Sequence, residues 1–162
     1  MASNVPTVRP VAWISMVPQL LFMGLLVFGY YLLGTQDFIL YGALTYLVVS
    51  FGLRYLIAHD HRKGMTLVKQ KYFQEAIPHF HKSYDFFTRY SWVDKYRFIT
   101  LLSSSKMCYR EMALNNIAFC YGQTGDGDKS IEYYNKALKI YETLGEKDGE
   151  ARNLGKTLVR IA

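Results

Sequence analysis

Residues 122–142, GQTGDGDKSIEYYNKALKIYE, decide the fold, because they form either a phosphate-binding loop or a turn between two helices. A phosphate-binding P-loop reads G-x-x-x-x-G-K-[ST] and follows a β-strand. Here Asp128 separates Gly127 from Lys129, and an insertion of one residue destroys the geometry of the motif. The carboxylates of Asp126 and Asp128 would also face an anionic phosphate. We therefore interpret the stretch as a turn.

Apolar residues recur at helical spacing on both sides of this turn. The stripe before it consists of Leu114, Ile117, Ala118 and Tyr121. The stripe after it consists of Ile131, Tyr134, Leu138 and Tyr141. Gly125 suits the turn itself, Asp126 suits the N-cap of the second helix, and Asp128 falls in its positive first turn. The pattern predicts a helix–turn–helix over residues 111–142.

This helix–turn–helix resembles a tetratricopeptide repeat, whose pattern is W-x₂-L-G-x₂-Y followed by A-x₃-F. The first stripe matches the first half of that pattern conservatively. Ser130 and Tyr134 match the second half, and Ala137 follows where the family favours a small residue. The closing proline that is frequent in the family is absent, with Glu142 near its place.

A second copy of the repeat occupies residues 60–87. It has the same spacing at Gly64, Leu67, Ala76, Phe80 and Ser83, but departs from the pattern at Asp60 and Lys63. A third fragment, beginning at Ala151, repeats the first half only, and we expect residues 147–162 to form a capping helix. About three repeats are normally needed for stability, so something else should cover the remainder.

An insertion, residues 89–110, separates the two copies. Because no breaker interrupts it from about Asp94 onward, we expect it to extend the next helix as one long helix ending near Gly122. A run of aromatic residues, interleaved with basic ones, begins just before the insertion and continues into it. The run consists of Phe86, Phe87, Tyr90, Trp92, Tyr96 and Phe98. These rings either pack between helices, touch a membrane interface or form a protein-binding edge.

Two uncharged apolar segments precede the repeats, at residues 11–33 and 38–53, and the second continues past Arg54 to residue 57. A helix needs about 20 apolar residues to cross the hydrocarbon core of a bilayer, so we predict two membrane spans, over residues 11–33 and 38–57. A signal peptide would have a shorter apolar region and a small-residue cleavage site, and neither is visible. The predicted organisation is a transmembrane hairpin over residues 1–58 and a cytoplasmic repeat domain over residues 59–162. Because only Gly52 and Gly64 could break a helix between these two parts, we expect the second span to run continuously into the first repeat.

Basic residues predict the orientation. Arg9 flanks one end of the hairpin, and Arg54, Arg62 and Lys63 flank the other, so both termini should be cytoplasmic. Residues 62–110 hold ten Lys/Arg against three Asp/Glu, which an anionic leaflet would favour, and no nucleic-acid motif accompanies this charge. With a minimal turn and no targeting segment before the first span, we expect a bacterial inner membrane.

Catalytic and metal sites are not indicated. In the pairs His59/His61 and His79/His81, residues two apart on a helix point about 200° away from each other, which favours solvated or interfacial histidines over a metal site. Residues 126–128 lack the further ligands of a calcium loop. Cys108 and Cys120 are expected as reduced, structural thiols. We predict no cofactor and no enzymatic activity.

The resemblance implies a module that binds peptides or proteins. We therefore expect an all-α membrane-anchored protein that recruits or organises other proteins at the cytoplasmic face. Two alternatives are an accessory subunit of a larger membrane complex and a self-assembling homo-oligomer. Candidate groove residues, carried over from the inner-helix face of the family, are Asn115 and Phe119. The aromatic run adds Phe87, Tyr90 and Trp92 as further candidate partner contacts.

Overall fold

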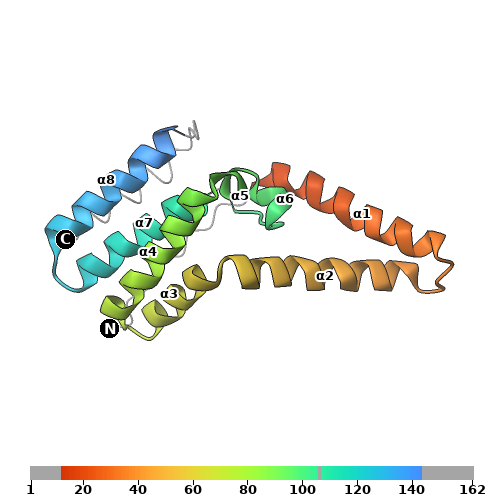
Figure 1. The fold of residues 1–162 in the computed structure, drawn as a ribbon, viewed down its shortest axis with the longest axis horizontal. Helices are drawn as coiled ribbons and strands as arrows, with labels where there is room; N and C mark the ends of the chain where they lie inside the picture. The colour runs from red at the N-terminus through yellow and green to blue at the C-terminus, as the bar shows by residue number, and fades with distance from the viewer. Residues whose placement is uncertain (1–11, 106, 144–162) are drawn as a thin grey trace. The chain divides into compact units, whose positions relative to one another are not determined.

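The computed structural model describes residues 12–105 and 107–143, and the regular elements within them are helices (Figure 1). In chain order they are η1 (Trp13–Ser15), α1 (Met16–Leu32), α2 (Phe38–Ile57), α3 (His59–Lys69), α4 (Phe73–Arg89), α5 (Ser91–Lys95), α6 (Arg97–Thr100), α7 (Tyr109–Gln123) and α8 (Gly127–Thr143). The predicted all-α class, with two apolar helices followed by a repeat-like region, is confirmed. The predicted capping helix lies outside the described residues.

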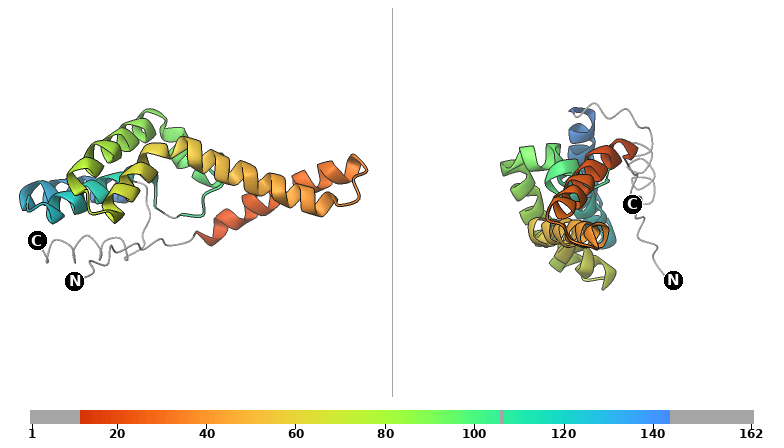
Figure 2. Two further views of the ribbon diagram at one scale, coloured as in Figure 1. Left: turned by 90° about the horizontal axis from the view of Figure 1, so that it is seen from below. Right: turned by 90° about the vertical axis from the view of Figure 1, so that its right-hand side faces the viewer.

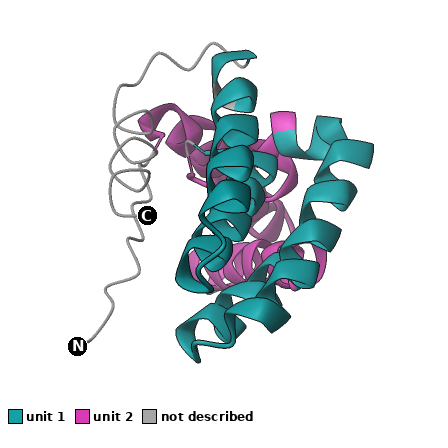
Figure 3. Ribbon diagram, turned by 90° about the vertical axis from the view of Figure 1, so that its left-hand side faces the viewer, with its two compact units in different colours: residues 1–6, 60–94, 107–162 teal, residues 7–59, 95–106 magenta. Residues whose placement is uncertain are grey.

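The described residues form two compact units (Figure 3). The repeat unit comprises residues 60–94 and the part of the chain that resumes at Met107. The hairpin unit comprises α1, α2 and residues 95–105, which we call the 95–105 segment. The insertion is therefore divided between the two units, although the sequence pattern assigned all of it to the repeat domain.

The turn between α7 and α8 is the predicted one. Gly125 has a φ of +83°, a conformation that a residue with a Cβ rarely adopts. The amides of Gly125 and Asp126 donate to the carbonyls of Gly122 and Tyr121, at 3.4 and 3.0 Å. These two bonds are the Schellman arrangement that ends a helix. Asp126 Oδ1 then accepts from the amide of Lys129 at 3.2 Å, which caps the start of α8.

The two repeat copies bury the same three positions. Ala76, Phe80 and Ser83 are buried on α4, and Ser130, Tyr134 and Ala137 are buried on α8. One apolar cluster joins α3, α4, α7 and α8 and contains Val68, Ala76, Ile77, Phe80, Leu114, Ile117, Cys120 and Ala137. The helical spacing that defines the repeat is therefore the spacing that fills this core.

Gly64 lets α3 and α4 approach each other closely. A Cβ added at Gly64 would lie 2.8 Å from Cε1 of the Phe80 ring. Because Phe80 is completely buried, its ring has no free space into which to move. The small residue of the repeat pattern is therefore required here by packing.

The hairpin unit is built on the antiparallel helices α1 and α2, which Figure 2 shows from two further directions. Gly34 has a φ of +71°, and α1 ends in the same Schellman pair as α7, in which the amides of Gly34 and Thr35 donate to the carbonyls of Tyr31 and Tyr30. Gly42 brings the helices together, since a Cβ there would lie 2.8 Å from Val27 Cα. Small residues at such crossings are typical of helices packed in membranes.

The structure corrects two expectations of long helices. The first is the helix over residues 94–122, because the chain instead forms α5 and α6, is not helical at residues 101–105 and 107–108, and begins α7 at Tyr109. Leu102, with a φ of +47°, lies outside the right-handed helical region, and three serines of low helix propensity follow it. The second is the continuous helix from α2 into α3, which is interrupted at Ala58, where ψ is +28°.

We predict that Gly64→Ala destabilises the chain, because the new methyl group overpacks the site against Phe80. Overpacking of this kind costs about 1–3 kcal/mol of the free energy of unfolding. Thermal unfolding of the full chain in detergent micelles measures the effect. Gly127→Ala is the matched control, because a Cβ there has no neighbour within 4 Å and Gly127 has no positive φ. Equal unfolding temperatures for the two variants would contradict the packing argument.

Candidate interaction surface

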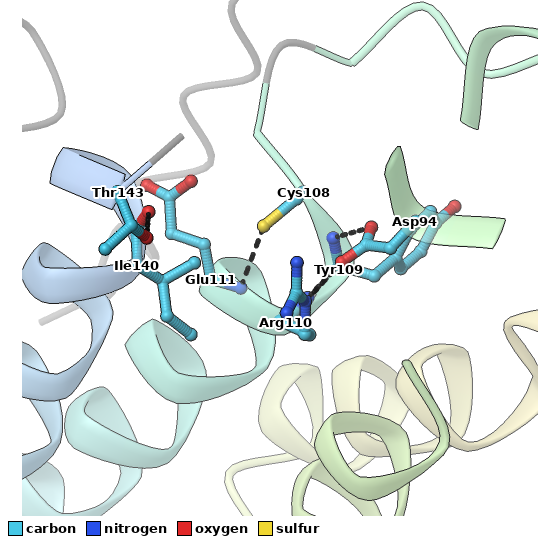
Figure 4. Close-up of polar contacts among 7 residues, drawn as sticks. All are labelled: Asp94, Cys108, Tyr109, Arg110, Glu111, Ile140 and Thr143. Carbon is cyan, nitrogen blue, oxygen red and sulfur yellow. Dashed lines mark hydrogen bonds and ion pairs between the residues drawn. The ribbon is translucent and has the colours of Figure 1, made fainter. Parts of the chain in front are cut away.

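Helix α7 carries both candidate groove residues, and its start is held by Asp94 (Figure 4). Asp94 Oδ1 accepts from the amide of Tyr109 at 2.7 Å. Its Oδ2 accepts from the amide and from Nε of Arg110, both at 3.2 Å. The carboxylate is completely buried, and it neutralises the positive end of the helix dipole. The chain leaves the repeat unit directly after Asp94 and returns to it at Met107, so the bonds of Asp94 hold the two ends of this excursion together.

The next cap on α7 is a thiol. Cys108 is the N-cap residue, and its Sγ accepts from the amide of Glu111 at 3.4 Å. Burial raises the pKa of Cys108 to about 12, and burial does the same for Cys120. Both cysteines are buried free thiols, as the sequence predicted. Protonated thiols of this kind are structural groups and are not nucleophiles.

Asn115 and Phe119 lie one turn apart on α7, and both are partly buried. Phe119 packs against the core cluster and meets Phe73 edge to face, with the ring centroids 5.9 Å apart. The pattern of the repeat did not single out Phe73, which is the first residue of α4. Its aromatic character directly after the turn of the first repeat is the signal that could have identified it.

A second aromatic row crosses α4, α7 and α8. Tyr133 stacks on Tyr121, with centroids 5.6 Å apart, and its hydroxyl lies 3.4 Å from His81 Nε2. The ammonium groups of Lys129 and Lys136 lie over the rings of Tyr121 and Tyr133, at 5.1 and 4.6 Å from the centroids. Burial raises the pKa of Tyr133, so its hydroxyl is neutral at physiological pH. Sequence reasoning missed this row because its residues come from three separate helices.

The aromatic run divides into buried and exposed rings. Phe87 is only 1% exposed and stacks on Tyr109, with the centroids 4.5 Å apart. This burial removes Phe87 from the candidate partner contacts, because its ring packs in the core of the repeat unit. Tyr90 and Trp92 are 42% and 58% exposed and are accessible to a partner.

The histidines contact neighbouring helices. His61 is buried, where solvated or interfacial histidines were expected, and its ring meets those of Phe80 and Tyr109 edge to face. Its Nδ1 lies 3.4 Å from the hydroxyl of Ser83. His79 Nδ1 lies 3.1 Å from Asp60, which is the residue that departs from the repeat pattern. Within the described residues, no group of three potential ligands is placed to hold a metal.

Of the basic residues Arg54, Arg62 and Lys63, which were predicted to flank the hairpin, Arg62 and Lys63 are exposed on α3. Arg54 differs, because it lies in the apolar helix α2 and its guanidinium is directed at backbone carbonyls. Its Nε donates to the carbonyl of Leu101 at 3.2 Å, and its Nη2 donates to the carbonyl of Leu102 and to the hydroxyl of Ser50. These bonds attach the 95–105 segment to the hairpin. Because Leu101 and Leu102 are not in a helix, their carbonyls have no helical donors. Arg54 supplies the donors instead.

The 95–105 segment is also tied to the other helix of the hairpin. The amide of Ala12, directly before η1, donates to the carbonyl of Ser104 at 2.9 Å. Arg97 Nε donates to the carbonyl of Ser105 at 3.0 Å, which folds the segment back on itself. Leu101 and Leu102, which lie in the chain between the bonded residues Arg97 and Ser104, are buried. The segment therefore bridges Ala12, the first described residue of the hairpin unit, and the last turn of α2.

Two stretches, Trp13–Leu32 and Phe38–Ile57, are each 20 residues long and apolar enough to cross a membrane. A core helix of a soluble protein passes the same test when its side chains are buried. Here most of the large apolar side chains are exposed, including those of Leu25, Val48 and Phe51. A signal sequence near the N-terminus can have the same length and composition as the first stretch, so it is the alternative to a membrane span there.

These features define a class of protein, an α-helical repeat domain joined to an apolar helical hairpin. The family model described as tetratricopeptide repeat matches residues 109–159. The match supports a tetratricopeptide repeat over these residues, and proteins of that family generally mediate binding to other proteins and are typically not enzymatic. No curated protein and no solved structure gave a match.

We predict that Asp94→Asn loosens the start of α7. The neutral amide loses the ion pair with Arg110 and sets an NH₂ group against backbone donors, which costs on the order of 3 kcal/mol for a buried pair. Hydrogen exchange should accelerate at the amides of Tyr109 and Arg110. The exposed Asp85→Asn is the matched control. Unchanged exchange in Asp94→Asn would show that the clasp does not hold the helix.

We also predict that Arg54→Leu releases the 95–105 segment, because each carbonyl left without a donor costs about 1–3 kcal/mol. Amide exchange at Leu101 and Ser103, which both donate to the carbonyl of Arg97, should rise. Arg54→Lys should give an intermediate effect, since a single ammonium cannot reproduce the planar fork of the guanidinium. Lys139→Leu, at an exposed position on α8, is the control. Protection that survives in Arg54→Leu would contradict the assignment.

Proposed function

We propose that the chain is a membrane-anchored interaction module that recruits or organises partner proteins at the cytoplasmic face of a membrane. The observation that carries the proposal is the presence in one chain of a tetratricopeptide repeat and two exposed apolar helices of spanning length. The repeat supports binding of a protein or peptide. The exposed apolar side chains of α1 and α2 support insertion in lipid, because water-exposed patches of that size are unfavourable.

The proposed topology places both termini in the cytoplasm. The turn between α1 and α2 contains one acidic and no basic residue, whereas basic residues follow α2 closely at Arg62 and Lys63. Retention of positive charge on the cytoplasmic side gives this orientation. The minimal turn between α1 and α2 supports assignment of the chain to a bacterial inner membrane.

The proposed docking surface is the face of α7 that carries Asn115 and Phe119, with Tyr90 and Trp92 as further candidate contacts. The partly buried Phe119, supported by Phe73, offers an apolar anchor, and the amide of Asn115 offers a donor and an acceptor for peptide groups. Aromatic anchors of this kind contribute a large part of the binding energy at interfaces. The core cluster behind Phe119 fixes the position of its ring.

The test is co-purification with the full-length chain, extracted gently and carrying a C-terminal tag. We expect a second polypeptide in fixed ratio, and we expect Asn115→Ala with Phe119→Leu to reduce its recovery at least about tenfold, the effect of losing 1.4 kcal/mol. Phe119→Leu keeps apolar volume in the core contact, so the variant should remain folded. Asn135→Ala, at an exposed position on α8, is the matched control.

The same preparation distinguishes the alternatives. A partner retained by a folded groove variant would overturn the groove and support an accessory subunit held through its spans. An assembly whose mass is a multiple of 18.8 kDa, with no second polypeptide, would indicate a homo-oligomer.

A further inference from the structure

The 95–105 segment carries large apolar side chains that are exposed instead of packed within the hairpin unit. Tyr96, directly before α6, and Ile99, within α6, are 52% and 63% exposed, while the following Leu101 and Leu102 are buried. The segment therefore has an inner side that packs and an outer side that is apolar. Its sequence, KYRFITLLSSS, contains Lys95 and Arg97 and no acidic residue.

The bonds of the segment fix its level along the hairpin. Arg54 is three residues from the end of α2, and Ala12 directly precedes η1, so both lie at the open end of the hairpin, away from the turn at Gly34. Their bonds to the carbonyls of Leu101 and Ser104 hold the segment at that end. Ile99, only two residues before Leu101, must lie within about 7 Å of it along the chain.

Other exposed apolar and aromatic side chains lie at the same end. Trp13 and Ile14 directly follow Ala12, and Tyr55 and Leu56 directly follow Arg54, and all four are more than half exposed. A 20-residue helix is about 30 Å long, which matches the hydrocarbon core, so the open end coincides with the boundary between lipid and water. Trp and Tyr are enriched at that boundary.

We propose that the 95–105 segment docks on the membrane surface, with Tyr96 and Ile99 inserted among the lipid headgroups beside the hairpin. This inference rests on the proposed membrane anchoring. The occupant of the exposed face is lipid, because the face continues the apolar surface of α1 and α2 and carries the exposed cation of Lys95, which suits an anionic leaflet. Arg97 is turned inward, toward the carbonyl of Ser105, so the outer side remains apolar.

The experiment places an environment-sensitive fluorophore on an introduced cysteine in the full chain. The variants are Ile99→Cys, with Tyr96→Cys as a second position in the segment. Val48→Cys in the middle of α2 is the reference for lipid, and Asn135→Cys on α8 is the reference for the repeat unit. The native thiols are buried, with pKa values raised to about 12, so a maleimide reacts selectively at the introduced site.

The labelled proteins are reconstituted in nanodiscs of phosphatidylcholine and anionic phosphatidylglycerol, without spin-labelled lipid, with lipids that carry a nitroxide near the headgroup, or with lipids that carry it deep in the acyl chain, which is the quencher for residue 48. Because interfacial segments bury their apolar face about 5–10 Å deep, the shallow nitroxide should remove at least about half of the fluorescence at residues 99 and 96. Iodide in the water should quench the label at residue 135 and should have little effect on the labels at residues 96 and 99.

The outcomes separate the two proposals. Iodide quenching at residues 96 and 99, with lipid quenching at residue 48, would overturn the docking of the segment and keep the anchoring. Shielding of both positions from iodide and from nitroxide would mean that protein covers them, which also overturns it. Lack of lipid quenching at residue 48 would overturn the anchoring itself, and the docking with it.

Discussion

The arrangement of the hairpin unit depends on the guanidinium of Arg54. An arginine near the end of an apolar helix must find acceptors, because an ion without partners in an apolar setting is costly. The carbonyls of Leu101 and Leu102 supply them, and those carbonyls have no helical donors of their own because Leu102 leaves the helical region. Each group thus satisfies the requirement of the other. The break in the predicted long helix and the charge in α2 have the same explanation.

Asp94 plays the corresponding part in the repeat unit. The segment that joins the hairpin unit begins directly after Asp94. A chain that leaves a packed domain and returns must have its two ends held together, and the loop-closure entropy of that excursion is opposed by the bonds from the carboxylate to Tyr109 and Arg110. The same bonds fix the first turn of α7, on which Asn115 and Phe119 depend for their positions.

Features determined by neighbouring residues could be predicted from the sequence, and features determined by distant residues could not. The turn at Gly125 follows from a glycine and an aspartate at adjacent positions, and the burial of Phe80 and Tyr134 follows from helical spacing. The acceptors of Arg54 lie 47 and 48 residues away, so no local pattern reveals them. The three serines at 103–105 were the available sign that a helix does not continue.

The candidate site was predictable to a smaller extent. The repeat pattern placed Asn115 and Phe119 on α7, but the contact of Phe119 with Phe73 joins two helices that are separated by the whole insertion. Phe87 was expected among the partner contacts because it lies in the aromatic run. Its ring is instead covered by Tyr109, which lies at the far end of the insertion. Burial of a single ring depends on its partner, which hydrophobic spacing does not identify.

On the proposed function, the two units compensate for each other. Two repeats offer a short binding face, and association from solution costs about 4–15 kcal/mol in lost translational and rotational freedom. Confinement of both molecules to one membrane removes part of that loss in advance, in the way that a tether raises effective concentration. A short face is then sufficient for a partner that is itself bound to the membrane, whereas a soluble partner would need a larger one. Anchoring and a small repeat domain are therefore mutually consistent in one chain.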